Sequence, residues 1–398
     1  MSNAHDQSSE PVAAATTRAD PGRLLGLTVI LVDETVTSGD LLDRTVAELE
    51  RCECDLLATK ELGPVEKRQI EEHIGRARGS ASPLTPATLL VIQDLAVAEL
   101  QGVSSGADSE RQSSLQARID HRLRQQLHQG RERSCVHISR NTQAAWQCVT
   151  SALAERAEDL LAEARRRATA YRSPFPVVRR LSPHVQRAKV ELVDYQGRAA
   201  VLKTFRIGKE RFLRREVLAH VELSRQIEGI PRALAHGENW ILVPYIEDTL
   251  GSSFRQLRFL PLPYAKHLIR FLEALYEAGY AHMDFSLKNA LFDRAGKLWV
   301  VDFEFLHRYE RRPDSFEESY DVVGPPAHFA GDLPEATIVR TYDRRLRKNT
   351  GLSLESLRGD PEWKQHLKRS IYFGTATLPR RIWWHAYRSW QRFGVRTA

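Results

Sequence analysis

Two polar clusters separated by a short hairpin-like run limit the folds open to this chain. Residues 282–289 read HMDFSLKN, and residues 300–304 read VVDFE. Between them, residues 290–299 place apolar side chains on both sides of the turn-forming run DRAGK, which predicts a β-hairpin. Eighteen residues separate Asp284 from Asp302, which is enough for one loop and one short hairpin.

This order, H-x-D-x-x-x-x-N followed by a hairpin and D-F-x, resembles the protein-kinase-like superfamily. Phosphoryl transfer needs a carboxylate that orients the attacking hydroxyl and accepts its proton, and it needs metal ions on the nucleotide phosphates. The resemblance implies that Asp284 is the catalytic base and that Asn289 and Asp302 bind Mg²⁺. It implies ATP as the phosphoryl donor.

Upstream runs occur in the order that the resemblance requires. Residues 200–203, AVLK, resemble the strand whose lysine contacts the α- and β-phosphates, which would be Lys203. The helix-like stretch 209–226 offers Glu216 as the ion-pair partner of Lys203. Glu210 and Glu222 are rival partners, but Glu216 lies in the middle of the expected helix, where the family places its glutamate.

The adenine end of the site is expected at residues 241–246, ILVPYI, which resemble the last strand of the N-terminal lobe and the hinge after it. Val243 and Tyr245 are the expected nucleotide-binding residues there. The resemblance covers about residues 176–345.

Several departures from the family's pattern bear on the acceptor. No glycine lies between Arg172 and Gln196, so the glycine-rich loop is absent and residues 181–185 would have to cover the phosphates. Glu304 stands where the metal motif usually has glycine, and no A-P-E run follows Asp302. Lys288, four residues after the base, could contact the transferred phosphate. Aminoglycoside phosphotransferases and lipopolysaccharide-core kinases share these departures, which favours a sugar, glycolipid or other small-molecule hydroxyl.

The first block of the chain carries a second resemblance. The apolar run 27–32, residues 39–43 and residues 57–62 look like the opening of a nucleoside-diphosphate kinase. Residues 134–139, SCVHIS, resemble the active-site histidine segment of that family. The implied fold is ferredoxin-like, and His137 would be the phosphorylated histidine.

The charged groups of that family are mostly missing. The phosphate-binding lysine falls on Val32, and the asparagine before the histidine falls on Ser134. Arg118 or Arg124 could match one of the family's arginines. Without those charges, nucleotide phosphates lose most of their electrostatic hold, so we expect a degenerate domain in which His137 is an ordinary histidine.

Charge is concentrated at the C-terminal end. The net charge is +7, and residues 340–398 alone hold 14 Arg and Lys against 4 Asp and Glu, together with four of the seven tryptophans. Residues 380–393 are predicted to form a short helix with aromatic side chains on one face and arginines on another. Such a helix could lie on an anionic membrane or dock on the protein itself; no nucleic-acid motif is present, so no nucleic acid is expected.

The expected fold class is α+β. A leader at 1–23 is expected to be disordered, and 24–167 to form a degenerate nucleoside-diphosphate-kinase-like domain. A linker at 168–175 precedes a bilobal kinase-like domain at 176–345, and 346–398 is a basic, aromatic-rich helical extension. The run SPFP at 173–176 is the best boundary signal.

Three functions remain open from the sequence: a kinase with a small hydroxyl acceptor, a protein serine/threonine kinase, and a pseudokinase or scaffold. The four intact positions at Lys203, Asp284, Asn289 and Asp302 speak against the third, and the missing docking run after Asp302 speaks against the second. Four cysteines in a chain of this length fit a reducing compartment. Neither a signal-peptide core nor a membrane-spanning run is present, so a cytoplasmic protein is expected, with the membrane periphery and oligomerisation left open.

Overall fold

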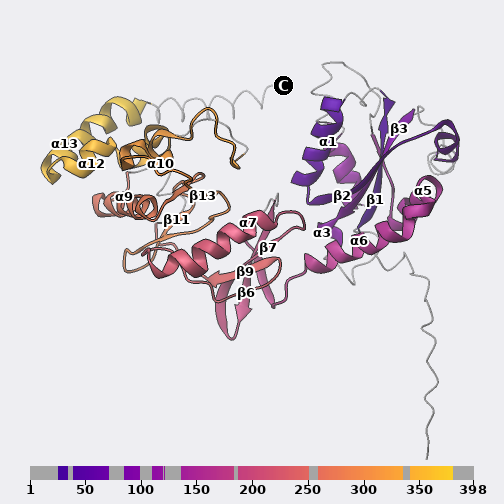
Figure 1. Ribbon diagram of the computed structural model, residues 1–398, viewed down its shortest axis with the longest axis horizontal. Helices are drawn as coiled ribbons and strands as arrows, with labels where there is room; N and C mark the ends of the chain where they lie inside the picture. The colour runs from indigo at the N-terminus through magenta and orange to yellow at the C-terminus, as the bar shows by residue number, and fades with distance from the viewer. Residues whose placement is uncertain are drawn as a thin grey trace, which may run out of the picture. The chain divides into compact units, whose positions relative to one another are not determined.

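The computed structural model describes residues 26–34, 39–70, 85–98, 110–119, 121, 136–182, 187–250, 259–334 and 341–379. The chain divides into two compact units, Met1–Arg172 and Ser173–Ala398, and each is considered by itself. Both mix helices with sheet, so the expected α+β class is confirmed (Figure 1). The expected leader, Cys135, Arg124 and the run after Pro379 lie outside the described residues. Within them, no helix combines the length and apolarity needed to cross a membrane.

The first unit is built on a four-stranded sheet in the order β2-β3-β1-β4, in which every neighbouring pair is antiparallel. Its strands are β1 (Leu27–Asp33), β2 (Cys54–Glu61), β3 (Pro86–Asp94) and β4 (Val136–Ile138). Successive side chains of β1 enter different cores, Leu31 on one face and Val32 on the other. Because both faces are covered, β1 is apolar along nearly its whole length, as the sequence shows.

Helices cover both faces of this sheet (Figure 1). The helices of the unit include α1 (Gly39–Arg51), the short α3 (Leu95–Ala98), α5 (Thr142–Ala152) and α6 (Ala157–Ala170). Residues of α5 and α6 pack with Leu31, and Leu49 of α1 packs on the opposite face. Residues 143–167 contain neither glycine nor proline, yet they belong to two helices. The chain leaves the helix at Leu153 (φ −133°, ψ 37°), which is itself buried in the core under α5 and α6.

The second unit begins with a five-stranded antiparallel sheet in the order β5-β6-β7-β9-β8. The strands are β5 (Val177–Arg180), β6 (Ala188–Tyr195), β7 (Arg198–Phe205), β8 (Ala235–His236) and β9 (Trp240–Pro244). Side chains of β7 alternate between faces: Ala200 and Leu202 enter a small core that Phe175 also contacts, whereas Val201 and Lys203 face the other way. This alternation is what places a lysine on the face that lines the cavity described below.

The helix expected over 209–226 is present in three pieces. An α-helix, α7 (Glu210–Val217), continues into a π-helical turn at Leu218–Glu222 and a 3₁₀ turn at Leu223–Arg225. Beyond the sheet lie the helices α9 (Leu262–Glu277), α10 (Tyr320–Val323), α11 (Lys348–Thr350), α12 (Leu354–Gly359) and α13 (Glu362–Tyr372).

Two small strand pairs lie between α9 and α10 in the chain. The pairs are β10 (Tyr280–His282) with β13 (Leu306–Arg308), and β11 (Ala290–Phe292) with β12 (Leu298–Val300). The second pair is the predicted hairpin, and its turn is closed by the amide of Asp293, which donates to the carbonyl of Lys297 at 3.1 Å. One large apolar core joins α7, α9 and both strand pairs.

The two-residue turn between β6 and β7 offers a test of the fold. Gln196 (φ 55°) and Gly197 (φ 75°) both adopt left-handed backbone, as a type I′ turn requires. A Cβ at residue 197 meets no atom within 4 Å, so only backbone conformation opposes it. We expect Gly197→Ala to lower the opening free energy of β6 and β7 amides by about 1 kcal/mol in hydrogen exchange. Gln196→Asn should change it in the opposite direction, and equal protection in both variants would contradict the turn assignment.

Candidate functional site

A cavity of about 650 Å³ opens in the second unit beside the sheet. One part of its wall is apolar and comes mainly from the strands, with Val190, Val201 and Val243 as examples. The other part is ionic and comes from β7, α7 and the chain after β12. The polar and charged side chains in the wall are Ser182, Arg187, Lys203, Glu216, His220, Tyr245, Asn289, Asp302 and Glu304. A cavity whose wall is apolar in part and ionic in part suits a ligand that has a flat apolar part and a charged part.

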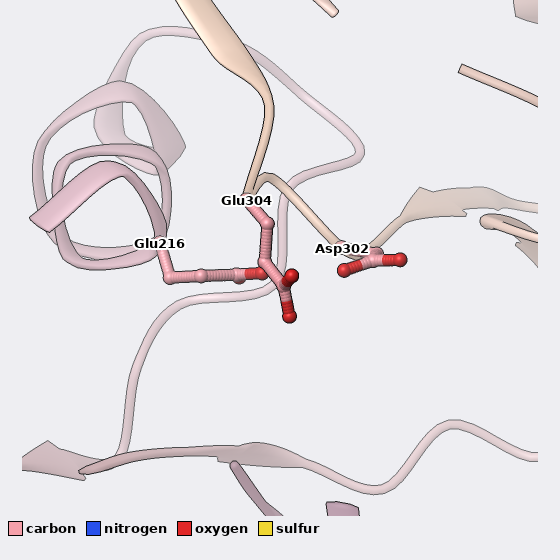
Figure 2. A group of neighbouring side chains, drawn as sticks. All are labelled: Glu216, Asp302 and Glu304. Atoms are coloured by element: carbon pink, nitrogen blue, oxygen red, sulfur yellow. The ribbon is translucent and has the colours of Figure 1, made fainter. Parts of the chain in front are cut away.

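Lys203 is the centre of the ionic wall. Its Nζ lies 2.5 Å from Glu216 Oε1, 2.7 Å from Asp302 Oδ1 and 3.4 Å from Glu304 Oε1. The three carboxylates come from α7 and from the segment after β12, and each offers an oxygen within 4.8 Å of the others (Figure 2). One ammonium therefore joins the sheet, the helix and the hairpin at a single point.

Burial sets the electrostatics of this cluster. Burial alone would lower the pKa of Lys203, but Asp302, Glu216 and Glu304 together hold it well above its ordinary value. Burial likewise opposes the charge of Glu216, yet Lys203 and His220 lower its pKa to about 2. Glu304 behaves differently, because burial and the nearby Asp302 raise its pKa in spite of Lys203 and Arg187. Lys203 and Glu216 thus form a charged pair at neutral pH.

His220 holds the second oxygen of Glu216. Its Nε2 lies 3.0 Å from Glu216 Oε2, and its Nδ1 lies 2.7 Å from the carbonyl oxygen of Pro231. The ring also meets Phe303 edge-on, with centroids 5.4 Å apart. Because both carboxylate oxygens have partners, the side chain of Glu216 has one defined direction, toward Lys203.

The loop between β10 and β11 carries Asp284 and Asn289. The side-chain amide of Asn289 donates to the carbonyl oxygen of Asp284 at 3.2 Å, and the amide of Val301 donates to the carbonyl of Asn289 at 2.9 Å. Asn289 therefore ties the loop to the strand that leads into Asp302. Asp302 itself has left-handed backbone (φ 70°), which is uncommon for a residue with a side chain and is typical of functional sites.

Two buried residues that sequence reasoning did not single out support this loop. Asp321 of α10 accepts a hydrogen bond from the amide of His282 at 3.1 Å. Arg345 donates to the carbonyl oxygen of Asp321 at 2.6 Å and lies 3.9 Å from its carboxylate. Burial raises the pKa of Asp321, and the Arg345 charge opposes that shift. No local pattern marks these residues, since 39 residues separate His282 from Asp321.

Glu304 connects the site to two arginines that sequence reasoning also missed. Arg187 Nε lies 2.5 Å from Glu304 Oε2, and the Arg187 guanidinium stacks over the Phe305 ring at 4.7 Å. Arg215, the neighbour of Glu216 on α7, donates to the backbone carbonyl of Glu304 at 3.0 Å and pairs with Asp332 at 2.7 Å. The glutamate in the expected glycine position is thus a structural link between β6, α7 and the chain after β12.

The structure brings most of the predicted site residues of the second unit to one cavity. Its wall includes Lys203, Glu216, Val243, Tyr245, Asn289 and Asp302. Asp284 is partly buried on the loop that ends at Asn289, and Lys288 is exposed; neither is part of the wall. The amide of Tyr245 donates to the carbonyl of Ala199 at 3.3 Å, so this amide is already used within the sheet.

Residues 181–185 are the segment expected to cover the phosphates. Leu181 and Ser182 of this segment line the cavity, and residues 183–185 lie outside the described residues.

The first unit places His137 in the middle of β4, opposite Leu31 of β1. Its neighbours Val136 and Ile138 enter the core on the α1 face, so the His137 ring lies toward the other face. Val32 is fully buried, and Arg118 pairs with Glu48 at 3.1 Å. Ser134 and Arg124 lie outside the described residues. Val32 therefore supplies no positive charge for a phosphate group, and Arg118 is already paired with a carboxylate of the same unit.

No family model matches the chain, and a search of curated proteins found no match.

His282 gives the site a measurable pH dependence. Burial lowers its pKa to about 4, with the Asp302 charge opposing the shift and the Arg345 charge adding to it. An unfolded histidine takes up its proton near pH 6.5, so the unfolded state binds more protons between about pH 6.5 and 4. Over that window we expect the wild type to lose about 3 kcal/mol of stability through this residue as pH falls. His282→Phe should remove that loss. The measurement is the unfolding free energy of the wild type minus that of His282→Phe, obtained from urea denaturation at each pH. A difference that does not change with pH would refute this prediction.

The pair formed by Asp321 and Arg345 should be strongly coupled. Asp321→Ala removes the carboxylate that lies 3.9 Å from the buried Arg345 guanidinium, so we expect the unfolding free energy to fall by about 3 kcal/mol. The double variant Asp321→Ala with Arg345→Met also removes the buried positive charge and should be more stable than Asp321→Ala alone. Urea denaturation of the wild type, the two single variants and the double variant measures the coupling free energy between the two side chains. Additive effects would show that the two side chains act independently.

Proposed function

We propose that the second unit is a phosphotransferase that moves the γ-phosphoryl group of ATP to the hydroxyl of a sugar, glycolipid or other small molecule. The observation that carries the proposal is the ion pair of Lys203 with Glu216 in a cavity that also contains Asn289 and Asp302. A lysine held by a buried glutamate is positioned to bind phosphate oxygens. Asp302 is the most accessible of the three carboxylates, with 39% of its side chain exposed, and can exchange Lys203 for another cation.

The proposed reaction joins the acceptor oxygen to the γ-phosphorus and breaks the bond from that phosphorus to the bridging oxygen of ADP. Asp284 accepts the proton of the acceptor hydroxyl, and Asn289 holds the Asp284 backbone through its 3.2 Å hydrogen bond. Lys203 holds phosphate oxygens and so opposes the charge that builds up on them. Asn289 and Asp302 offer the amide and carboxylate oxygens that Mg²⁺ prefers, and the ion would neutralise phosphate charge when bound.

The apolar and the ionic part of the cavity wall fit the two parts of a nucleotide. Val201 and Val243, which are paired across β7 and β9, offer apolar wall for a base, and Lys203 and Asp302 form the ionic wall for phosphates. Because the amide of Tyr245 is used by Ala199, a base would bond to other backbone groups of this segment.

The proposal also includes the fold family of each unit. A five-stranded antiparallel sheet with a helix that carries Glu216, followed by a mainly helical part, supports a bilobal kinase-like fold for the second unit. The order β4-β1-β3-β2, with antiparallel neighbours throughout, supports a ferredoxin-like fold for the first unit. We propose that this first unit is a degenerate relative of nucleoside-diphosphate kinases.

The test is phosphoryl transfer by the full chain with Mg²⁺ and γ-labelled ATP, with a panel of sugars and glycolipids as acceptors. We expect Lys203→Met, Asp284→Asn and Asp302→Asn each to lower kcat by about 10² to 10⁴. His137→Ala is the matched control and should leave the rate unchanged. Thermal unfolding of each variant, with and without Mg-ATP, separates loss of chemistry from loss of binding.

Three other outcomes would overturn parts of the proposal. Acid-stable labelling of protein serine or threonine, without turnover on small acceptors, would assign a protein kinase. Acid-labile labelling that His137→Ala abolishes would assign the chemistry to the first unit. A wild-type protein that neither hydrolyses nor binds ATP would be a pseudokinase or scaffold, consistent with the absent glycine-rich loop.

A further inference from the structure

One face of α13 and of the turn that follows it is apolar and exposed. The side chains of Trp363, Leu367 and Ile371 are 69%, 53% and 56% exposed, and Leu378 beyond them is 44% exposed. The first three follow one another at intervals of four residues, so they form a single stripe on the helix. We call these four residues the α13 stripe. Exposed apolar side chains in a continuous row mark an interaction surface more often than scattered ones do.

The opposite face of α13 is the one that attaches the helix to its unit. Gln365 is buried, and its side-chain amide donates to the carbonyl oxygens of Ser356 and Leu357 in α12 at 2.9 and 3.1 Å. Arg369 donates to the carbonyl of Leu260 and stacks over the Phe259 ring. Since these contacts fix the rotation of the helix, the α13 stripe cannot turn inward without breaking them. Figure 1 shows α13 in yellow beside α12.

Basic residues lie beside the stripe and follow it in the sequence, and the acidic Glu362 before Trp363 pairs with Lys266 at 2.9 Å. Lys364 and Lys368 lie at the edge of the stripe, and both contact Asp360, at 2.8 and 2.7 Å. One carboxylate therefore serves two ammonium groups, which leaves a net positive charge there. The next residues along the chain, 380–398, contain five arginines and three tryptophans and no acidic residue.

We propose that the α13 stripe binds an anionic membrane surface. Aliphatic side chains such as Leu367 and Ile371 enter the acyl boundary, tryptophan favours the headgroup region, and adjacent lysine and arginine attract anionic lipid. A second copy of the chain fits less well, because it would bring two segments of the same strong positive charge together. Single-stranded nucleic acid would use aromatic rings for stacking but would leave the aliphatic side chains of the stripe exposed. This inference does not depend on the proposed phosphotransferase activity.

The experiment is flotation of the full chain with two kinds of vesicle, pure phosphatidylcholine and phosphatidylcholine with about 30 mol% phosphatidylglycerol. We expect binding to the anionic vesicles alone, and weaker binding as salt is raised. The double variant Leu367→Glu with Ile371→Glu should lower the vesicle partition coefficient by about tenfold or more. Val178→Glu is the matched control, because Val178 is an equally exposed apolar residue (63%) on β5, and its binding should match the wild type.

Two results would overturn the proposal. If the wild type does not bind anionic vesicles, or if the double variant binds them as well as the wild type does, the stripe is not a lipid-binding face. If sedimentation velocity shows concentration-dependent self-association that the double variant abolishes, the stripe is an interface between copies of this chain. Circular dichroism of the double variant checks that α13 is retained, which is expected because the substituted side chains are exposed.

Discussion

The second unit depends on one interaction above the others, the contact of the Lys203 ammonium with carboxylates from α7 and from the chain after β12. Taking these charges out of water costs several kcal/mol for each ion, and their mutual attraction offsets this cost only when the geometry is good. The short distances from Lys203 to Glu216 and Asp302 meet that condition. Because Asp302 lies 99 residues after Lys203, the cluster acts as a tertiary constraint: shifting α7 or the hairpin would strand a buried charge. A site built this way is organised before any ligand arrives.

Around this cluster, the loops are held by side chains that bond to backbone groups. Asn289 bonds to the carbonyl of Asp284, Asp321 to the amide of His282, and Arg215 to the carbonyl of Glu304. A loop near a protein interior has no strand or helix partner for its amides and carbonyls, so polar side chains must supply the bonds. Aromatic packing adds to this support, since the His282 ring lies against Phe303 with centroids 5.0 Å apart. The order of the loop therefore follows from hydrogen bonding and packing together.

How far the sequence predicts this site depends on the range of each interaction. The strand that carries Lys203 and the hairpin before Asp302 are local patterns of alternation and turn residues, and both are present. Glu216, and not its rival Glu210, meets Lys203, because Glu210 lies at the exposed start of α7, where it accepts a bond from the amide of Gly208 at 2.7 Å. Asp321, Arg345 and Arg187 could not be identified, since each meets its partner through tertiary contacts that no spacing rule encodes. His220 lies four residues after Glu216 on the same helical run, so the helical spacing was a signal that could have indicated it. The break between α5 and α6 at Leu153 has no local signal either, because neither glycine nor proline marks it and Leu153 is buried in the core that these helices share with the sheet.

Glu304, which stands where the kinase-like metal motif usually has glycine, has the largest effect on the charge of the site. With Lys203 and Arg187 positive and Glu216, Asp302 and Glu304 negative, the cluster has a net charge of −1 when every group is ionised. A bare polyphosphate would be repelled by the carboxylates as much as it is attracted by the lysine, and no glycine-rich loop precedes β6 to add backbone amides. A divalent cation beside Asp302 would change the sign of the cluster to +1, and protonation of Glu304, whose pKa is raised by burial, would remove one negative charge. Under the proposed function, phosphate binding in this chain therefore depends more on the metal ion than it would in a site with glycine at position 304.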